Sequence, residues 1–202
     1  MTNPKEILPI LHLIRAGLAA GLLTKEEVID WADKVITKDE QPDIFFIDLA
    51  LSSSKSVNDI IYYISDFLNF ENPAVQGRPL LGLLYKQFSS KQLTLEQTVR
   101  KLFRLKFEAV FTDREEGYFN SIDNDFDCAK HNIYGTLEDV YADVDKFLGF
   151  YKGYSLDSFE QWLDLNSEVE SKLDEDINRK QEEERITQVN IQNPGKPWWK
   201  FW

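Results

Sequence analysis

The sequence has little of the chemistry that metal sites and nucleophilic catalysis use: one cysteine and two histidines in 202 residues. Cys128 has no second cysteine to pair with, which fits a reducing compartment. Cys128 and His131 have the spacing of a nucleophile and a base on one helix face. A buried structural cysteine is nevertheless the more common case. A zinc site needs further ligands, and His12 is the only other histidine. We therefore expect neither a metal site nor a cofactor.

Familiar catalytic motifs are also absent: there is no P-loop, GxGxxG, GxSxG or HExxH. Residues 123–127 resemble the start of a calcium loop, with Asp at its first, third and fifth positions. However, Cys128 stands where the loop needs glycine, and Tyr134 stands where it needs glutamate. We expect a polar acidic loop there, and a protein that is not an enzyme.

The sequence contains no long uninterrupted hydrophobic run. The most apolar stretch, residues 7–23, is interrupted by His12 and Arg15, and Glu6 precedes it. It is too short and too polar to span a bilayer or to act as a signal peptide. We interpret it as a buried helix, and we expect a cytoplasmic protein that does not bind membranes.

Helix-start signals are frequent. Thr24 with Glu27 and Thr94 with Gln97 form capping boxes, and Thr136 opens a related pattern. Apolar residues follow each of them at helical spacing. The sequence therefore predicts an all-α protein, with helices near residues 7–20, 24–37, 43–52, 56–69, 77–89, 94–111, 113–120, 136–150 and 155–184. The one candidate strand, residues 186–192, does not alternate cleanly.

The predicted organisation is a helical body over residues 1–163, either a compact multi-helix bundle or an irregular helical array. A charged helical extension follows over residues 164–185, and a tail with an aromatic C-terminus over residues 186–202. Residues 23–26 and 93–96 are similar and lie 70 positions apart. They indicate either a helical repeat or two well-formed helix starts that look alike.

The chain is acidic, with a net charge of −12. Such a chain is repelled by nucleic acid and by anionic membranes, and it attracts basic partners. Charge is also segregated: residues 76–107 hold seven basic side chains, whereas residues 112–145 hold ten acidic ones. The two stretches either pair with each other across the fold or leave an acidic surface for a partner.

The C-terminus is rich in tryptophan. Trp198, Trp199 and Trp202 follow a linker that contains proline and glycine. Leaving such side chains in water costs about 25 cal/mol per Å² of apolar surface. The tail is expected to fold back on its own body, to dock on a partner, or to sit at a membrane interface.

Residues 21–33, followed by Pro42-Asp43 and a short apolar stretch, resemble the opening of small helical bacterial proteins. Some of these are immunity proteins of polymorphic toxin systems. The resemblance implies a protein that binds and neutralises a toxin without catalysis, and it carries over no functional residues.

Our first hypothesis is a binding protein for one basic protein partner, such as a nuclease toxin, as a monomer or a small homo-oligomer. A structural or adaptor protein that docks through Trp198, Trp199 and Trp202 is the second. An enzyme without a familiar motif is the third, and it would require a deep pocket with a perturbed titratable group. The contact residues of the first hypothesis are all acidic: Glu115, Glu116, Asp123, Asp125, Asp127, Glu138 and Asp139.

Overall fold

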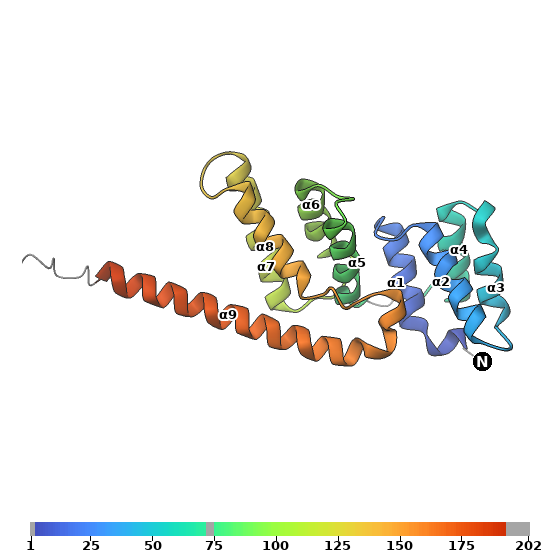
Figure 1. The fold of residues 1–202 in the computed structure, drawn as a ribbon. Coiled ribbons are helices and arrows are strands. Elements are labelled where there is room, and N and C mark those ends of the chain that lie inside the picture. The colour runs from blue at the N-terminus through green and yellow to red at the C-terminus, as the bar shows by residue number, and fades with distance from the viewer. Residues whose placement is uncertain (1–2, 72–74, 193–202) are drawn as a thin grey trace, which may run out of the picture. The chain divides into compact units, whose positions relative to one another are not determined.

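The computed structural model describes residues 3–71 and 75–192 and shows an all-α protein (Figure 1), as predicted. Within these residues the backbone forms helices and no strand, apart from one isolated bridge between Gln76 and Val110. The α-helices are α1 (Leu8–Ala19), α2 (Lys25–Lys38), α3 (Ile44–Ala50), α4 (Val57–Phe67), α5 (Gly77–Ser89), α6 (Leu95–Leu105), α7 (Asp113–Lys130), α8 (Leu137–Gly149) and α9 (Trp162–Gln192). Three short 3₁₀ helices are η1 (Pro4–Glu6), η2 (Ser52–Ser54) and η3 (Leu156–Gln161).

The predicted helix starts are confirmed. Complete capping boxes open α2 at Thr24, α6 at Thr94 and α8 at Thr136. Ser56 and Thr112 do the same for α4 and α7. In each case the side chain accepts a hydrogen bond from a backbone N–H that would otherwise lack a partner in the first turn.

One prediction of local structure is wrong. Residues 123–127 form no loop, because α7 continues to Lys130. Four buried residues at helical spacing favour this continuation: Phe119, Ile122, Phe126 and Ala129. The candidate strand at residues 186–192 is part of α9. None of the described helices combines the length and the apolar character that crossing a membrane requires.

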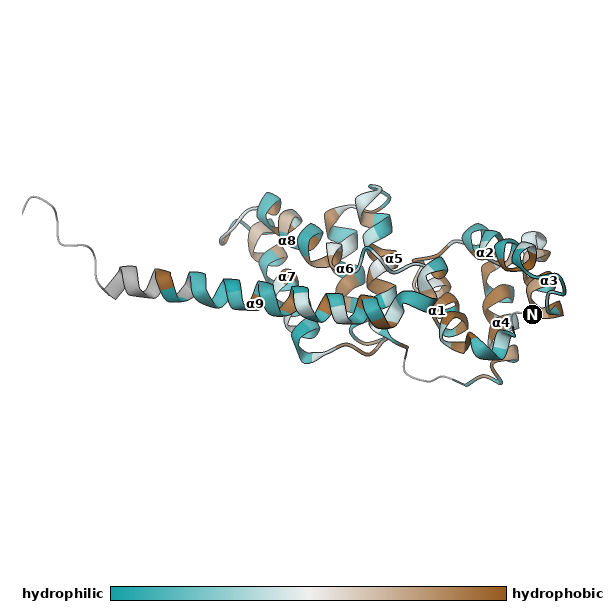
Figure 2. Ribbon diagram, turned by 60° about the horizontal axis from the view of Figure 1, so that its bottom comes forward, coloured by the Kyte–Doolittle hydropathy of each residue, from teal (hydrophilic) through white to brown (hydrophobic). Residues whose placement is uncertain are grey.

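The chain divides into two compact units, Met1–Leu165 and Asn166–Trp202. In the first unit, α1 packs against α4 and α5, and α2 packs against α3. Helix α5 also packs against α6 and α8, and α7 lies against α6 and α8. Hydrophobic residues make up most of α1, as Figure 2 shows, and Leu11, Ile14 and Leu84 are fully buried in this core.

The two similar sequence stretches adopt the same helix–turn–helix geometry. Gly21 follows α1 with a φ of +63°, and Lys91 follows α5 with a φ of +59°. After each of them the next backbone N–H bonds back to the preceding helix: Leu22 to Gly17 O at 2.7 Å, and Gln92 to Gln87 O at 2.9 Å. Both turns are therefore left-handed helix caps of the same kind.

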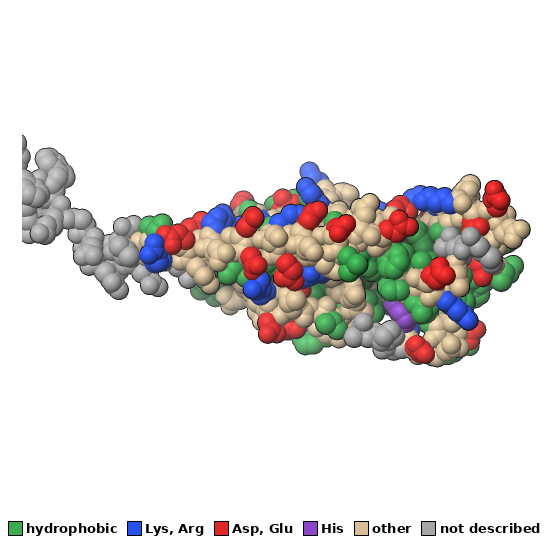
Figure 3. Space-filling model, turned by 90° about the horizontal axis from the view of Figure 1, so that it is seen from below, with side chains coloured by type: hydrophobic (Ala, Val, Ile, Leu, Met, Phe, Trp, Pro, Cys, Tyr) green, Lys and Arg blue, Asp and Glu red, His purple; other side chains and the backbone are tan. Residues whose placement is uncertain are grey.

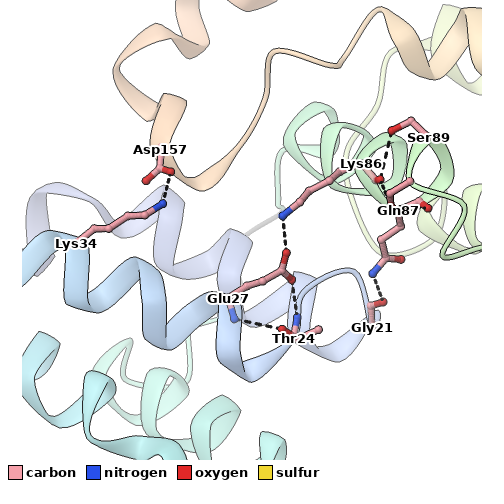
Figure 4. A network of polar contacts seen from close by, with 9 residues as sticks. Gly21, Thr24, Glu27, Lys34, Lys86, Gln87, Ser89 and Asp157 are labelled. Atoms are coloured by element: carbon pink, nitrogen blue, oxygen red, sulfur yellow. Dashed lines mark hydrogen bonds and ion pairs between the residues drawn. The ribbon is translucent and has the colours of Figure 1, made fainter.

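Polar contacts join the turn after α1 to α5 and α6, and Figure 4 shows the contact made by Gln87 of α5. Gln87 Nε2 donates to the carbonyl oxygen of Gly21 at 3.1 Å, and Lys101 Nζ donates to the carbonyl oxygen of Ala20 at 2.7 Å. Lys86 pairs with Glu27, whose carboxylate also closes the α2 capping box. Lys101 of α6 and the amide of Gln87 of α5 thus satisfy carbonyl groups at the C-terminal end of α1, where the helix dipole favours the positive charge of Lys101.

The shared turn generates a prediction on stability. Lys91 has a left-handed backbone conformation, which costs L-residues roughly 1–2 kcal/mol, whereas Gly21 adopts the same conformation without strain. Lys91→Gly should raise the free energy of unfolding by about 0.5 kcal/mol, since part of the relief is offset by chain entropy. Gly21→Ala should lower it by about 1 kcal/mol. Urea unfolding followed by circular dichroism measures both, and equal destabilisation by the two changes would contradict this account.

Candidate functional site

Glu115, predicted to contact a partner, lies in the interior. Its side chain is 1% exposed and accepts hydrogen bonds from Arg78 Nε at 2.8 Å and from the Tyr151 hydroxyl at 2.9 Å. Thr112 Oγ1 donates to the same carboxylate at 2.9 Å. Burial raises the pKa of Tyr151 well above its usual value, and the negative charge of Glu115 adds to the shift. The expectation for Glu115 is therefore corrected: it joins α5, α7 and the end of α8.

Three other predicted contact residues on α7 also interact within the fold. Glu116 pairs with Lys106 at 3.4 Å. Asp125 accepts hydrogen bonds from the Tyr134 hydroxyl at 2.9 Å and from Ser121 Oγ at 3.1 Å. Asp123 is half-buried, and this burial raises its pKa.

Asp127 lies one turn after Asp123, and its charge raises the pKa of Asp123 further. The guanidinium of Arg100 on α6 opposes this shift. The hydrogen bond to Glu96 raises the pKa of Arg100, and the charges of Asp127 and Asp123 add to this rise. Lys130 at the end of α7 pairs with Glu96 of α6 at 2.9 Å. Of the two alternatives for the segregated charge, pairing across the fold is seen in Arg78–Glu115 and Lys106–Glu116, whereas Lys130–Glu96 joins the minority charges of the two stretches.

The helical conformation separates the carboxylates that resembled a calcium loop. Asp123 and Asp127 share one face of α7, whereas Asp125 lies on another and holds Tyr134. Hydrogen bonds to the Cys128 thiol and to the Asp125 carboxylate raise the pKa of Tyr134 to about 12. Over residues 3–71 and 75–192, no three His, Cys, Asp or Glu side chains come together as metal ligands would.

Large apolar side chains are exposed where α7 turns into α8. The exposed fractions are 70% for Ile133, 52% for Tyr134, 43% for Leu137 and 44% for Tyr141. The turn is well defined, because Asn124 Nδ2 donates to the Tyr134 hydroxyl at 2.7 Å, and that hydroxyl donates to Asp125. We call these four residues the α7–α8 corner.

Acidic side chains of α8 surround the corner. Asp139 is engaged in the capping box with Thr136, whereas Glu138, Asp143 and Asp145 are exposed and have no ion-pair partner in the described part of the chain. At 100° per residue, Glu138 and Asp145 lie on the same side of α8 as Leu137 and Tyr141. This juxtaposition of exposed apolar and unpaired acidic groups was missed from sequence, although the amphipathic spacing was visible.

The second unit, as far as described, is the continuation of α9. Acidic and basic side chains are interspersed along this segment (Figure 3). They pair within the helix, as in Lys172–Glu168 at 3.4 Å and Arg185–Glu182 at 2.8 Å. Such pairs stabilise a helix by about 0.2–0.5 kcal/mol each. Trp198, Trp199 and Trp202, the predicted docking residues of the tail, lie outside the described residues.

The first unit also contains a cavity of about 210 Å³. His12 and Trp162 line it, and both are more than nine-tenths buried. His12 Nδ1 and Trp162 Nε1 have no hydrogen-bond partner, a state that costs about 1–3 kcal/mol for each buried group. The other lining residues come from the start of α1 and from the segment that leads into α5: Leu8, Pro9, Leu13, Val75 and Gln76.

Among the described residues that line this cavity, His12 alone has a titratable side chain. Burial lowers its pKa, the nearby Arg15 lowers it further, and Glu71 opposes both. General acid–base catalysis uses groups that exchange protons with a substrate, usually with a second group placed beside them. The cavity lining supplies no carboxylate, thiol or amine to act with His12.

The shifted pKa of His12 predicts a pH dependence of stability. Because the folded-state pKa is lowered, the unfolded chain binds more protons as the pH falls below about 6.5, and stability decreases there. The wild type should lose unfolding free energy between about pH 7.5 and 5.5, above the range in which carboxylates titrate. The variant His12→Leu should lose less. An equal loss in both proteins, measured by urea unfolding, would exclude His12 as the cause.

No protein-family model, curated protein or solved structure matches this chain. The resemblance of residues 21–33 to immunity-type proteins therefore stays a prediction.

Proposed function

We propose that this protein is a non-catalytic binding module that engages a basic protein partner through the α7–α8 corner and the unpaired acidic side chains of α8. The observation that carries the proposal is the exposure of Ile133, Tyr134, Leu137 and Tyr141 at the α7–α8 corner, next to Glu138 and Asp145. Apolar side chains at the centre and charged side chains around them are the usual composition of a protein interface.

The apolar part would provide the affinity. Tyrosine is enriched at interface hot spots, and it loses little conformational entropy on binding. Tyr134 is already held by hydrogen bonds to Asn124 and Asp125. Tyr141 packs against Phe88 of α5, with 4.9 Å between ring centroids. A partner would therefore meet side chains that are ordered in advance, which lowers the cost of association.

The acidic part would determine the kind of partner. No Lys or Arg side chain of the described residues pairs with Glu138 or Asp145, so their negative charge is available to attract a basic surface. Association with such a partner should be faster at low ionic strength, because salt screens exposed charges over about 10 Å. Toxin nucleases, which bind phosphate with basic clefts, are partners of this class, in keeping with the immunity-type resemblance.

An adaptor that docks through its aromatic tail is the second candidate. It rests on the sequence alone, on Trp198, Trp199 and Trp202 behind a linker that contains proline and glycine.

Paired variants test the first proposal. Ile133→Ser with Leu137→Ser removes the apolar part of the corner. Ile44→Ser with Leu51→Ser is a matched control on another surface, since those two side chains are 66% and 73% exposed. Glu138→Gln with Asp145→Asn removes two charges, and Asp30→Asn with Asp33→Asn removes two elsewhere. Each tagged protein is incubated with lysate of the source organism at low salt, and retained proteins are identified by mass spectrometry.

We expect the wild type and both controls to retain the same basic protein, and salt to release it. The apolar corner variant should lose about 2 kcal/mol of binding free energy, roughly 30-fold in affinity. The charge variant should bind more weakly and with a flatter salt dependence. Equal retention by the corner and control variants would refute the proposed surface. Retention that is lost when residues 194–202 are removed would favour the adaptor.

A further inference from the structure

We propose that the cavity between α1, the segment that leads into α5 and the start of α9 is a binding site for a small uncharged aromatic molecule with one hydrogen-bonding group, of which phenol is the simplest example. The site shares no residue with the α7–α8 corner and does not depend on the function proposed for it. All its residues belong to the first compact unit.

The size of the cavity fits a single ring. Its volume is about 210 Å³. An apolar cavity of about 150 Å³ is known to accept benzene in another protein, so this one holds a ring with one substituent. Three separate segments form the walls, with Leu13 in α1, Val75 before α5 and Trp162 at the start of α9. A site assembled from segments that the core holds in place is formed before the ligand arrives.

The character of the walls selects against charge. Leu8, Pro9, Leu13 and Val75 are apolar, and none of the described residues that line the cavity has a charged side chain near neutral pH. An ion would lose its hydration there without compensation. His12 does not supply a compensating charge near neutral pH, because burial lowers its pKa.

Two buried nitrogens without partners provide the polar end of the site. Trp162 Nε1 is a donor only, and His12 Nδ1 in the neutral ring accepts when the proton is on the other nitrogen. A hydroxyl group both accepts and donates. Each of the two nitrogens exposes less than 1 Å² of surface, so its ring turns toward the cavity when a ligand hydroxyl pairs with it. A ligand that pairs with them is favoured over one that leaves them unpaired.

Nuclear magnetic resonance of the full chain tests the proposal directly. The indole N–H signals of ¹⁵N-labelled protein are recorded while phenol, toluene or benzoate is added. Trp162→Phe identifies the Trp162 signal by its loss, and Trp31→Phe is the control for a buried indole outside the cavity. Calorimetry gives the affinities, and circular dichroism confirms that each variant is folded.

We expect phenol to shift the Trp162 signal saturably and to leave that of Trp31 unchanged. Toluene should bind about tenfold more weakly, and benzoate should not bind. Trp162→Phe should reduce the affinity for phenol about tenfold and leave that for toluene nearly unchanged. The proposal is overturned if phenol causes no saturable shift, if benzoate or toluene binds as tightly as phenol, or if folded Trp162→Phe binds phenol with wild-type affinity.

Discussion

The carboxylate of Glu115 is buried, and the arrangement of the second half of the helical body depends on satisfying it. Arg78 from α5, Tyr151 after α8 and Thr112 before α7 all donate to it. Removing one partner of a buried ion pair costs about 3–5 kcal/mol, because it leaves a charge in the interior without compensation. These contacts fix the start of α7 relative to α5 and to the end of α8. The position of the α7–α8 corner follows from that constraint.

The same reasoning explains why a net charge of −12 does not describe the surface of this protein well. Glu116, Asp125 and Asp139 interact within the fold, and Asp123 faces Arg100. Acidic side chains of α7 thus contact α6 and cap the start of α7 itself. The unpaired acidic side chains of α8 lie beside exposed apolar residues, and it is this combination, more than the total charge, that supports binding of a basic partner.

The sequence predicted what depends on local chemistry. Thr24, Thr94 and Thr136 opened helices because a capping box is complete within four residues. The continuation of α7 was missed because acidic residues obscured the apolar spacing of Phe119, Ile122 and Phe126. The burial of Glu115 was not predicted. Its pairing with Arg78, 37 positions away, could not be predicted, and neither could the meeting of His12 with Trp162, because tertiary packing alone brings these residues together.

A double-mutant cycle on Arg78 and Glu115 tests most directly whether this buried pair organises the body. The variants are Arg78→Met, Glu115→Gln and the double change, with free energies of unfolding measured in urea. We predict that each single change destabilises by about 3 kcal/mol and that the double change destabilises by clearly less than their sum, with a coupling on the order of 2 kcal/mol. Additive effects within about 0.5 kcal/mol would show that the two groups act independently and would contradict the account.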